Sequence, residues 1–143
     1  MTNQFSYPVK LTKQKEGGYL VQFPDLPEAI TQGDDIEDAL NQAEDCLEEA
    51  IAYRIISKLD VPVPSQKKKN KYVSLSTTFA AKLALYQAMK EIEMTNILLA
   101  KKLNCDEKEV RRLLDPHYRS KLPRIEQALN KLGKKLQVQV VSF

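Results

Sequence analysis

Cysteine and histidine are scarce in this chain. The two cysteines, Cys46 and Cys105, are far apart in sequence, and His117 is the only histidine. This spacing offers neither a disulfide framework nor the clustered ligands of a zinc site. A lone histidine with no evident Ser, Cys or metal partner also argues against general-base catalysis. We therefore expect a protein that is not an enzyme and that uses no metal and no cofactor.

Long hydrophobic segments are absent as well. No apolar run approaches the roughly 18 residues that a membrane span needs. The first residues do not form a basic-then-apolar leader either. From these absences and the low cysteine content we expect a cytoplasmic protein.

Charge is distributed unevenly along the chain, although the net charge is only +3. Residues 1–64 contain five Lys/Arg against twelve Asp/Glu, a net of −7. Residues 71–143 contain fourteen Lys/Arg against seven Asp/Glu, a net of +7, and lysines occupy all three positions 67–69 between them. Opposite charges of this size suggest two partners: nucleic acid for the basic part and a basic protein for the acidic part.

The acidic part begins with a pattern of short strands. Apolar residues alternate over residues 5–23, which predicts a hairpin with a loop around Lys13–Gly18. Pro8 inside the first strand suggests an edge position or a bulge. Pro24–Pro27 is predicted to break the ladder before a short third strand at Glu28–Gln32.

A long helix is predicted after these strands. Apolar residues recur at three- and four-residue steps from Ile36 to Ile55, and Asp35 is a good N-cap. After a loop or linker at about 60–71, Tyr72–Leu75 is expected to rejoin the sheet, which gives a β-β-β-α-β order. The outer face of the helix carries six carboxylates: Glu37, Asp38, Glu44, Asp45, Glu48 and Glu49.

The basic part has a helical pattern from Thr78 onward. Asp115-Pro116 stops the third of its helices, and the fourth is predicted from about Lys121 to Leu132, with Ser120 as its N-cap and Gly133 at its end. The tail Leu136–Val140 alternates and is predicted to form a strand whose edge could pair across a two-fold axis.

Residues 95–114 have the pattern of a helix-turn-helix. Thr95 caps the first helix, and the small Ala100 would let the second helix pack across it. Asn104 tolerates the positive φ that the turn needs. Asp106 caps the second helix, and the Glu three positions later, Glu109, is expected to complete a capping box. Three apolar residues of the second helix would face the core: Val110, Leu113 and Leu114.

With Val110 facing the core, a helical step of about 100° per residue turns Lys108, Arg111 and Arg112 outward. In helix-turn-helix proteins this face enters the major groove of DNA, where Arg can bind guanine edges. The alternative is that these cations only form a solvated face of the helix and bind no partner. Further candidate DNA-binding residues are Asn96 and Glu107 and, as phosphate contacts, Lys101, Lys102, Arg119, Lys121 and Arg124.

Several segments resemble the HicB antitoxin family, in the family's order, over about residues 5–136. They are Tyr19–Pro27, Thr31–Asp34, Ala39–Ala43, Leu83–Ala88, Arg112–His117 and Ala128–Lys134. The resemblance implies a truncated ribonuclease-H-like N-terminal domain without catalysis. It also implies a partner, HicA, which is a small mRNA-cleaving toxin with a catalytic His, and repression of the operon by a homodimer bound to operator DNA.

On this resemblance we expect a toxin-binding domain at residues 1–76 and a helix-turn-helix domain for DNA binding and dimerisation at 77–143. The expected toxin-binding residues are Asp25 and the six helix carboxylates. One alternative is a stand-alone transcription regulator whose N-terminal module senses a small molecule. Another is an enzyme with a ribonuclease-H-like centre, but Asp35 is better used as a helix cap than with Asp34 as a magnesium ligand.

Overall fold

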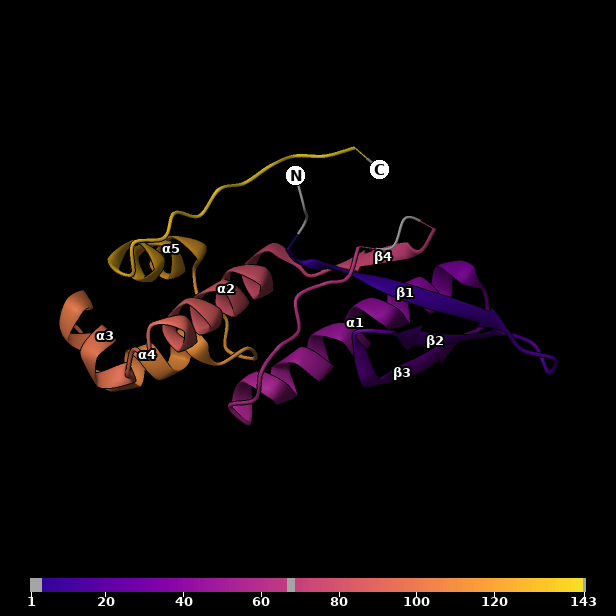
Figure 1. Ribbon diagram of the computed structural model, residues 1–143, viewed down its shortest axis with the longest axis horizontal. Coiled ribbons are helices and arrows are strands. Elements are labelled where there is room, and N and C mark those ends of the chain that lie inside the picture. The colour runs from indigo at the N-terminus through magenta and orange to yellow at the C-terminus, as the bar shows by residue number, and fades with distance from the viewer. Residues whose placement is uncertain (1–3, 67–68, 143) are drawn as a thin grey trace. The chain divides into compact units, whose positions relative to one another are not determined.

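The computed structural model describes residues 4–66 and 69–142, so Lys67 and Lys68 of the predicted linker lie outside the described residues. Contacts divide the chain into two compact units, Met1–Ser76 and Thr77–Phe143, called here the sheet unit and the helical unit. The described elements, labelled in Figure 1, are β1 (Ser6–Lys13), β2 (Tyr19–Phe23), β3 (Leu26–Gly33), α1 (Ile36–Ile56), β4 (Lys71–Ser74), α2 (Thr77–Glu91), α3 (Asn96–Leu103), α4 (Glu107–Leu114) and α5 (Leu122–Lys131).

The sheet unit contains a four-stranded antiparallel sheet in the order β3-β2-β1-β4, and α1 packs on it (Figure 1). β1 and β2 form the predicted hairpin, in which Lys10 lies opposite Gln22. β4 pairs antiparallel with the other side of β1, so that Tyr7 lies opposite Val73. The predicted β-β-β-α-β order is confirmed. The ribonuclease-H-like character implied by the resemblance stays a prediction.

Two prolines are placed differently from the prediction. Pro8 does not lie on an edge strand, because β1 has β2 on one side and β4 on the other. The two ladders do not overlap, since β4 pairs with Ser6–Val9 and β2 with Lys10–Lys13. A residue without an N–H is tolerated there because the strand pairs on one side only. β3 starts at Leu26 and includes Pro27, which is compatible with its position at the edge of the sheet.

The helix α1 begins where the sequence predicts, because Asp35 Oδ1 accepts a hydrogen bond from the Asp38 backbone N–H at 2.7 Å. Ile36 is 41% exposed, so the buried stripe starts one turn later than predicted, at Ala39. Gly33 lets this turn approach the sheet closely, since a Cβ there would come within 2.3 Å of the Ala39 backbone nitrogen. The core between α1 and the sheet includes Tyr7, Val21, Phe23, Leu26, Leu47 and Ile51.

The helical unit has its own core, to which all four of its helices contribute. Its fully or almost fully buried members include Leu85 of α2, Leu99 of α3, Val110 and Leu113 of α4, and Ile125 and Leu129 of α5. Small units of this size bury a limited core, so the orientation of each helix also depends on polar contacts.

Two predictions at the end of the helical unit are wrong. Residues 134–142 form no strand, and Val140 is 94% exposed, because an alternating segment becomes a strand only where a ladder partner satisfies its backbone. Ser120 does not cap α5: Lys121 is the N-cap residue, and it makes no side-chain cap bond. The Ser120 hydroxyl is already bonded to Lys82 and to the carbonyl of Arg112.

Candidate nucleic-acid and partner-binding surfaces

Local caps fix the turn between α3 and α4. Thr95 Oγ1 accepts from the Leu98 N–H at 3.1 Å, and Asp106 Oδ1 accepts from the Glu109 N–H at 2.9 Å. Asn104 adopts the left-handed conformation, with φ 54° and ψ 45°, and ends α3. These three residues are the ones that the sequence predicts for these roles. The turn therefore holds the two helices in a defined geometry.

One face of α4 is cationic and exposed. Val110 and Leu113 are buried in the core of the helical unit, as predicted. On the opposite side Lys108, Arg111 and Arg112 are exposed, and these three residues are called the α4 face. Burial of the apolar side therefore orients the cationic side toward solvent, where a polyanion can reach it.

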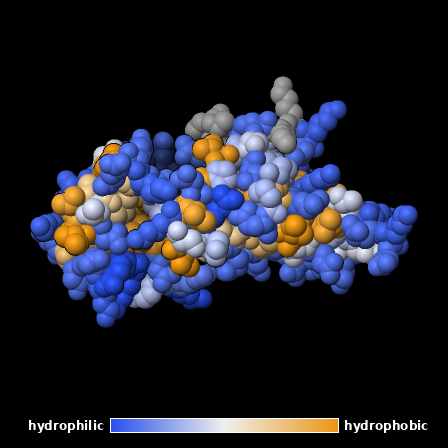
Figure 2. All heavy atoms as spheres, turned by 60° about the horizontal axis from the view of Figure 1, so that its bottom comes forward, coloured by the Kyte–Doolittle hydropathy of each residue, from blue (hydrophilic) through white to orange (hydrophobic). Residues whose placement is uncertain are grey.

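The other residues that we predict to contact DNA come before and after the α4 face in the sequence. Lys101 and Lys102, in the last turn of α3, are exposed, as are Glu107, Arg119 and Lys121. Asn96, in the first turn of α3, is half-buried. Figure 2 shows a mainly hydrophilic surface on the face turned to the viewer, with separate hydrophobic patches rather than one continuous patch.

Arg124 makes contacts within the helical unit that the sequence does not predict. Its Nε donates to Glu109 Oε1 at 2.7 Å, and its Nη1 donates to Gln127 Oε1 at 2.9 Å. The carboxylate of Glu109 therefore does not complete a capping box, because it binds Arg124 instead of the backbone at the start of α4. The hydrogen bond from Arg124 also lowers the pKa of Glu109. This pair ties α5 to α4, while the phosphate contact of Arg124 stays a prediction.

A buried cation supports the end of α4, and sequence reasoning missed it. Lys82 of α2 is 2% exposed, and its ammonium donates three hydrogen bonds. The acceptors are the carbonyl oxygens of Arg112 at 2.9 Å and Asp115 at 2.7 Å, and Ser120 Oγ at 2.9 Å. Burial lowers the pKa of Lys82 to about 8, and the nearby Asp115 carboxylate opposes this shift.

The sequence does contain a signal for this lysine. Lys82 follows Phe79 by three positions and precedes Tyr86 by four, so it lies in the apolar stripe of α2 rather than on its polar face. A lysine in such a stripe is almost never fully buried unless its charge is bonded. Its partners lie 30–38 residues further along the chain, so the sequence could not name them.

The ring of Tyr118 lies close to two of these cations. The Lys82 ammonium is 5.8 Å from its centroid, and the guanidinium carbon of Arg112 is 5.6 Å from it. Both distances are within the range of cation–π attraction. Tyr118 itself is 45% exposed and belongs to the loop between α4 and α5. Through Tyr118, the loop therefore contacts both the buried Lys82 and the exposed Arg112 of the α4 face.

In the sheet unit, the predicted acidic residues divide into two groups. Glu37, Glu44, Asp45 and Glu49 are exposed along α1 and are called the α1 acidic face. The other three carboxylates serve the fold. Each of them accepts a backbone N–H at 2.8 Å: Asp38 from Asp34, Glu48 from Ser76, and Asp25 from Ser65.

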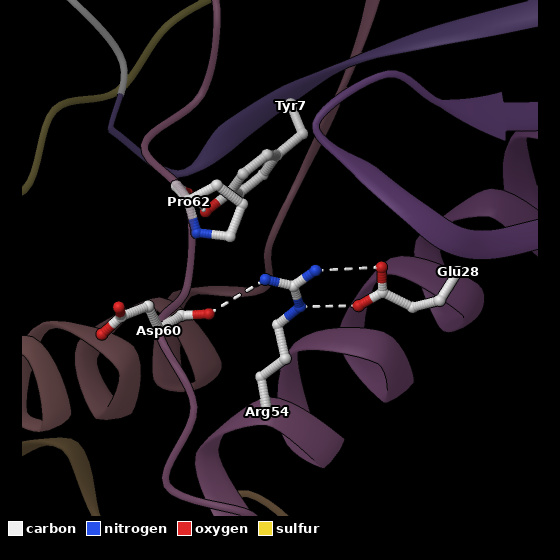
Figure 3. Close-up of polar contacts among 5 residues, drawn as sticks. All are labelled: Tyr7, Glu28, Arg54, Asp60 and Pro62. Carbon is white, nitrogen blue, oxygen red and sulfur yellow. Dashed lines mark hydrogen bonds and ion pairs between the residues drawn. The ribbon is translucent and has the colours of Figure 1, made fainter.

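Arg54, at the end of α1, anchors the segment that follows the helix (Figure 3). Its Nε and Nη2 bind both carboxylate oxygens of Glu28 on β3, at 2.6 and 3.0 Å, and its Nη1 donates to the carbonyl of Asp60 at 3.0 Å. The hydroxyl of Tyr7 donates to the carbonyl of Pro62 at 2.8 Å. Burial raises the pKa of Tyr7 to about 12, so this phenol stays a donor. Sequence reasoning did not predict this cluster.

The described part of the chain forms no metal centre. No three His, Cys, Asp or Glu side chains among residues 4–66 and 69–142 gather closely enough to hold a metal ion. Asp35 is used as the cap of α1, and His117 lies exposed, with its backbone N–H bonded to Asp115. Both cysteines are free thiols. None of the described helices is long and apolar enough to span a membrane.

Comparison with known proteins matches this chain to one family. Residues 6–84 match the family model described as HicB-like antitoxin of bacterial toxin–antitoxin systems. The chain belongs to the HicB-like antitoxin family. It is 35% identical over 141 residues to "Antitoxin HicB 2" of Photorhabdus laumondii, covering 99% of this chain and 100% of the relative. It is 33% identical over 136 residues to "Antitoxin HicB" of Escherichia coli K12, covering 94% and 99%.

Family membership confirms the resemblance found in the sequence. The family model covers the strands and α1 of the sheet unit and the first residues of α2. The curated relatives extend the likeness through the helical unit, because they match almost the whole chain. An antitoxin role in a toxin–antitoxin pair follows for the chain as a whole.

Proposed function

We propose that this antitoxin has two separate binding activities, one in each unit. The sheet unit neutralises a HicA-type, mRNA-cleaving toxin, and the helical unit represses the operon by binding operator DNA. The observation that carries the proposal is the separation of exposed charge, with carboxylates along α1 and cations on α4. A ribonuclease presents a cationic surface to RNA, and DNA presents phosphates, so each surface suits one partner.

For DNA, we propose that α3 and α4 act as a helix-turn-helix, with α4 in the major groove. Arg111 and Arg112 would bind base edges, since Arg forms bidentate bonds with guanine. The exposed Lys101, Lys102 and Lys121 would bind phosphates and set affinity rather than sequence choice. We also propose a homodimer, because such proteins read two half-sites about 34 Å apart.

Two single substitutions test the DNA proposal in the full-length protein. The probe is a duplex with the promoter sequence of the chain's own operon, and a shuffled duplex of equal length is the reference. Arg112→Ala should reduce binding to the promoter duplex by about 5- to 100-fold, with little change for the shuffled duplex. Lys101→Ala should weaken both duplexes alike and reduce the salt dependence. Equal, negligible effects of both substitutions would reject the α4 face as the DNA-reading surface.

For the toxin, we propose that the α1 acidic face covers the cationic RNA-binding surface of the ribonuclease. The test combines Glu37→Lys, Glu44→Lys and Asp45→Lys in the full chain, co-expressed with the small protein encoded beside it. Growth should be arrested, because like charges now face each other. A matched control reverses one exposed carboxylate of the helical unit, Glu126→Lys, which should still protect. Full protection by the triple variant would place the toxin elsewhere.

The same reagents distinguish the alternative function, a stand-alone regulator that senses a small molecule. An antitoxin should form a stable complex with the co-encoded protein and protect cells from it. A regulator of the other class should bind its promoter with an affinity that changes with a metabolite and not with that protein.

A further inference from the structure

We infer that Lys82 and Tyr118 position the Arg112 guanidinium for DNA reading, Lys82 by fixing the end of α4 and Tyr118 by holding the side chain. The inference rests on the proposed DNA-binding function. It explains how Arg112, which we propose to bind base edges, is oriented. Neither residue belongs to the exposed α4 face. Both are therefore positioning residues.

The first step is the match between the Lys82 ammonium and its acceptors. An ammonium has three N–H donors, and three acceptors surround it at 2.7–2.9 Å. Two acceptors are the carbonyl oxygens of Arg112, in the last turn of α4, and of Asp115, its C-cap residue. Each of these carbonyls also accepts one backbone N–H, from Asp115 and Tyr118 respectively. A cation is also favoured there by the helix dipole. One of the carbonyls belongs to Arg112 itself, so Lys82 holds the backbone of the residue that we propose to contact the bases.

The second step concerns the loop from Asp115 to Ser120. Its first and last residues are both bound by Lys82, through the Asp115 carbonyl and the Ser120 hydroxyl. The Ser120 hydroxyl also lies 3.4 Å from the Arg112 carbonyl, to which it donates. A loop held at both ends by one buried group keeps Tyr118, which lies between them, at the end of α4.

The third step is the contact between Tyr118 and Arg112. The guanidinium carbon lies 5.6 Å from the ring centroid. An exposed arginine on a helix otherwise samples many rotamers, and binding then costs the entropy of selecting one. A ring that holds the guanidinium reduces this cost, so Arg112 is pre-organised before DNA arrives. Cation–π attraction at an exposed site corresponds to about two- to five-fold in affinity.

The test has a DNA-free arm and a DNA arm, both in the full-length chain. The DNA-free arm follows the Arg112 Nε–H resonance by NMR, because an aromatic ring nearby shifts it. Wild type and Tyr118→Phe, which keeps the ring, should show the ring-shifted signal. Tyr118→Ala and Lys82→Met should lose it. An unchanged signal in Tyr118→Ala would overturn the inference.

The DNA arm measures the preference for the promoter duplex over the shuffled duplex. Tyr118→Ala should lower this preference about two- to five-fold, Tyr118→Phe should retain it, and Tyr118→Ala should add nothing in an Arg112→Ala background. Equal losses on both duplexes, or an additive effect with Arg112→Ala, would show that Tyr118 acts independently and would overturn the inference. If wild type shows no preference, the proposed DNA reading fails, while the NMR arm still decides whether the ring holds Arg112.

Discussion

Each unit uses one long cationic side chain to hold an irregular segment against a helix, but the two cations work in different surroundings. Arg54 in the sheet unit is partly exposed, binds the Glu28 carboxylate and holds the segment after α1. Lys82 in the helical unit is buried, binds two carbonyls and a hydroxyl, and holds the loop after α4. The pKa of Arg54 is raised by its carboxylate partner, whereas that of Lys82 is lowered by burial.

This difference shows which charges are structurally important in a strongly charged chain. A solvent-exposed ion pair is screened and contributes little, so Arg54 can be lost at small cost. Removing the buried ammonium of Lys82 takes one hydrogen bond from each of three acceptors inside the fold, which costs more. The exposed charges on α1 and α4, which we propose to bind partners, lie on elements that these internal cations help to hold in place.

The largest effect on stability should come from the buried cation. Lys82→Met should lower the free energy of unfolding of the helical unit by about 1–3 kcal/mol, because three acceptors each lose one hydrogen bond. Urea unfolding combined with hydrogen exchange at the α4 amides measures it. Lys131→Met, at an exposed position of α5, is the matched control and should change stability very little. Equal effects of the two substitutions would remove the distinction drawn above.

A second prediction uses pH to separate the charge of Lys82 from its packing. The folded pKa is about 8 and the ordinary value is 10.5, so between these pH values the unfolded chain binds more protons. The stability of wild type should therefore rise relative to Lys82→Met as the pH increases through this window. The ionisable groups near the ammonium are the Asp115 carboxylate, which raises its pKa, and Tyr118, whose ring centroid lies 5.8 Å away. A relative fall over the same window would contradict the assignment.

The corresponding change in the sheet unit should be smaller. Arg54→Met removes the bonds to Glu28 and to the Asp60 carbonyl, and should cost up to about 1 kcal/mol because the pair is partly exposed. The cost should shrink at high salt, unlike that of Lys82→Met. Urea unfolding at low and high salt checks this. A salt-independent loss larger than that of Lys82→Met would reverse the comparison.

The smallest effect concerns the pair between α4 and α5. Glu109→Gln should weaken the bond to Arg124 and release its guanidinium, so affinity for any duplex should rise about two-fold. The salt dependence of binding should steepen, since one more cation can reach phosphate. Fluorescence anisotropy on the promoter and shuffled duplexes checks this, with Glu126→Gln as a control for the loss of one negative charge. A gain confined to the promoter duplex would mean that Glu109 acts at the base-reading surface.

Features that depend on residues three or four positions apart could be predicted from the sequence. The caps at Asp35, Thr95 and Asp106 and the turn at Asn104 are of this kind. So is the outward direction of the α4 face, which follows from the burial of Val110.

Features that depend on distant partners could not be predicted. Ser120 precedes a helix and has a capping side chain, but Lys82, 38 residues earlier, binds its hydroxyl. Glu109 fits a capping box locally, yet Arg124 binds it from α5. The tail has the alternation of a strand but no ladder partner within the chain. In each case a tertiary contact, or its absence, overrides a local pattern.

The most direct test of the central claim is whether the two surfaces can be disabled independently in one protein. Binding of the promoter duplex and of the co-encoded toxin is measured for wild type, for the triple reversal on α1 and for Arg112→Ala. The account predicts that the α1 reversal abolishes toxin binding while DNA affinity stays within about two-fold. It also predicts that Arg112→Ala lowers promoter affinity about 5- to 100-fold while toxin affinity stays within about two-fold. Toxin binding that survives the α1 reversal, or a promoter affinity that is unchanged by Arg112→Ala, would contradict it.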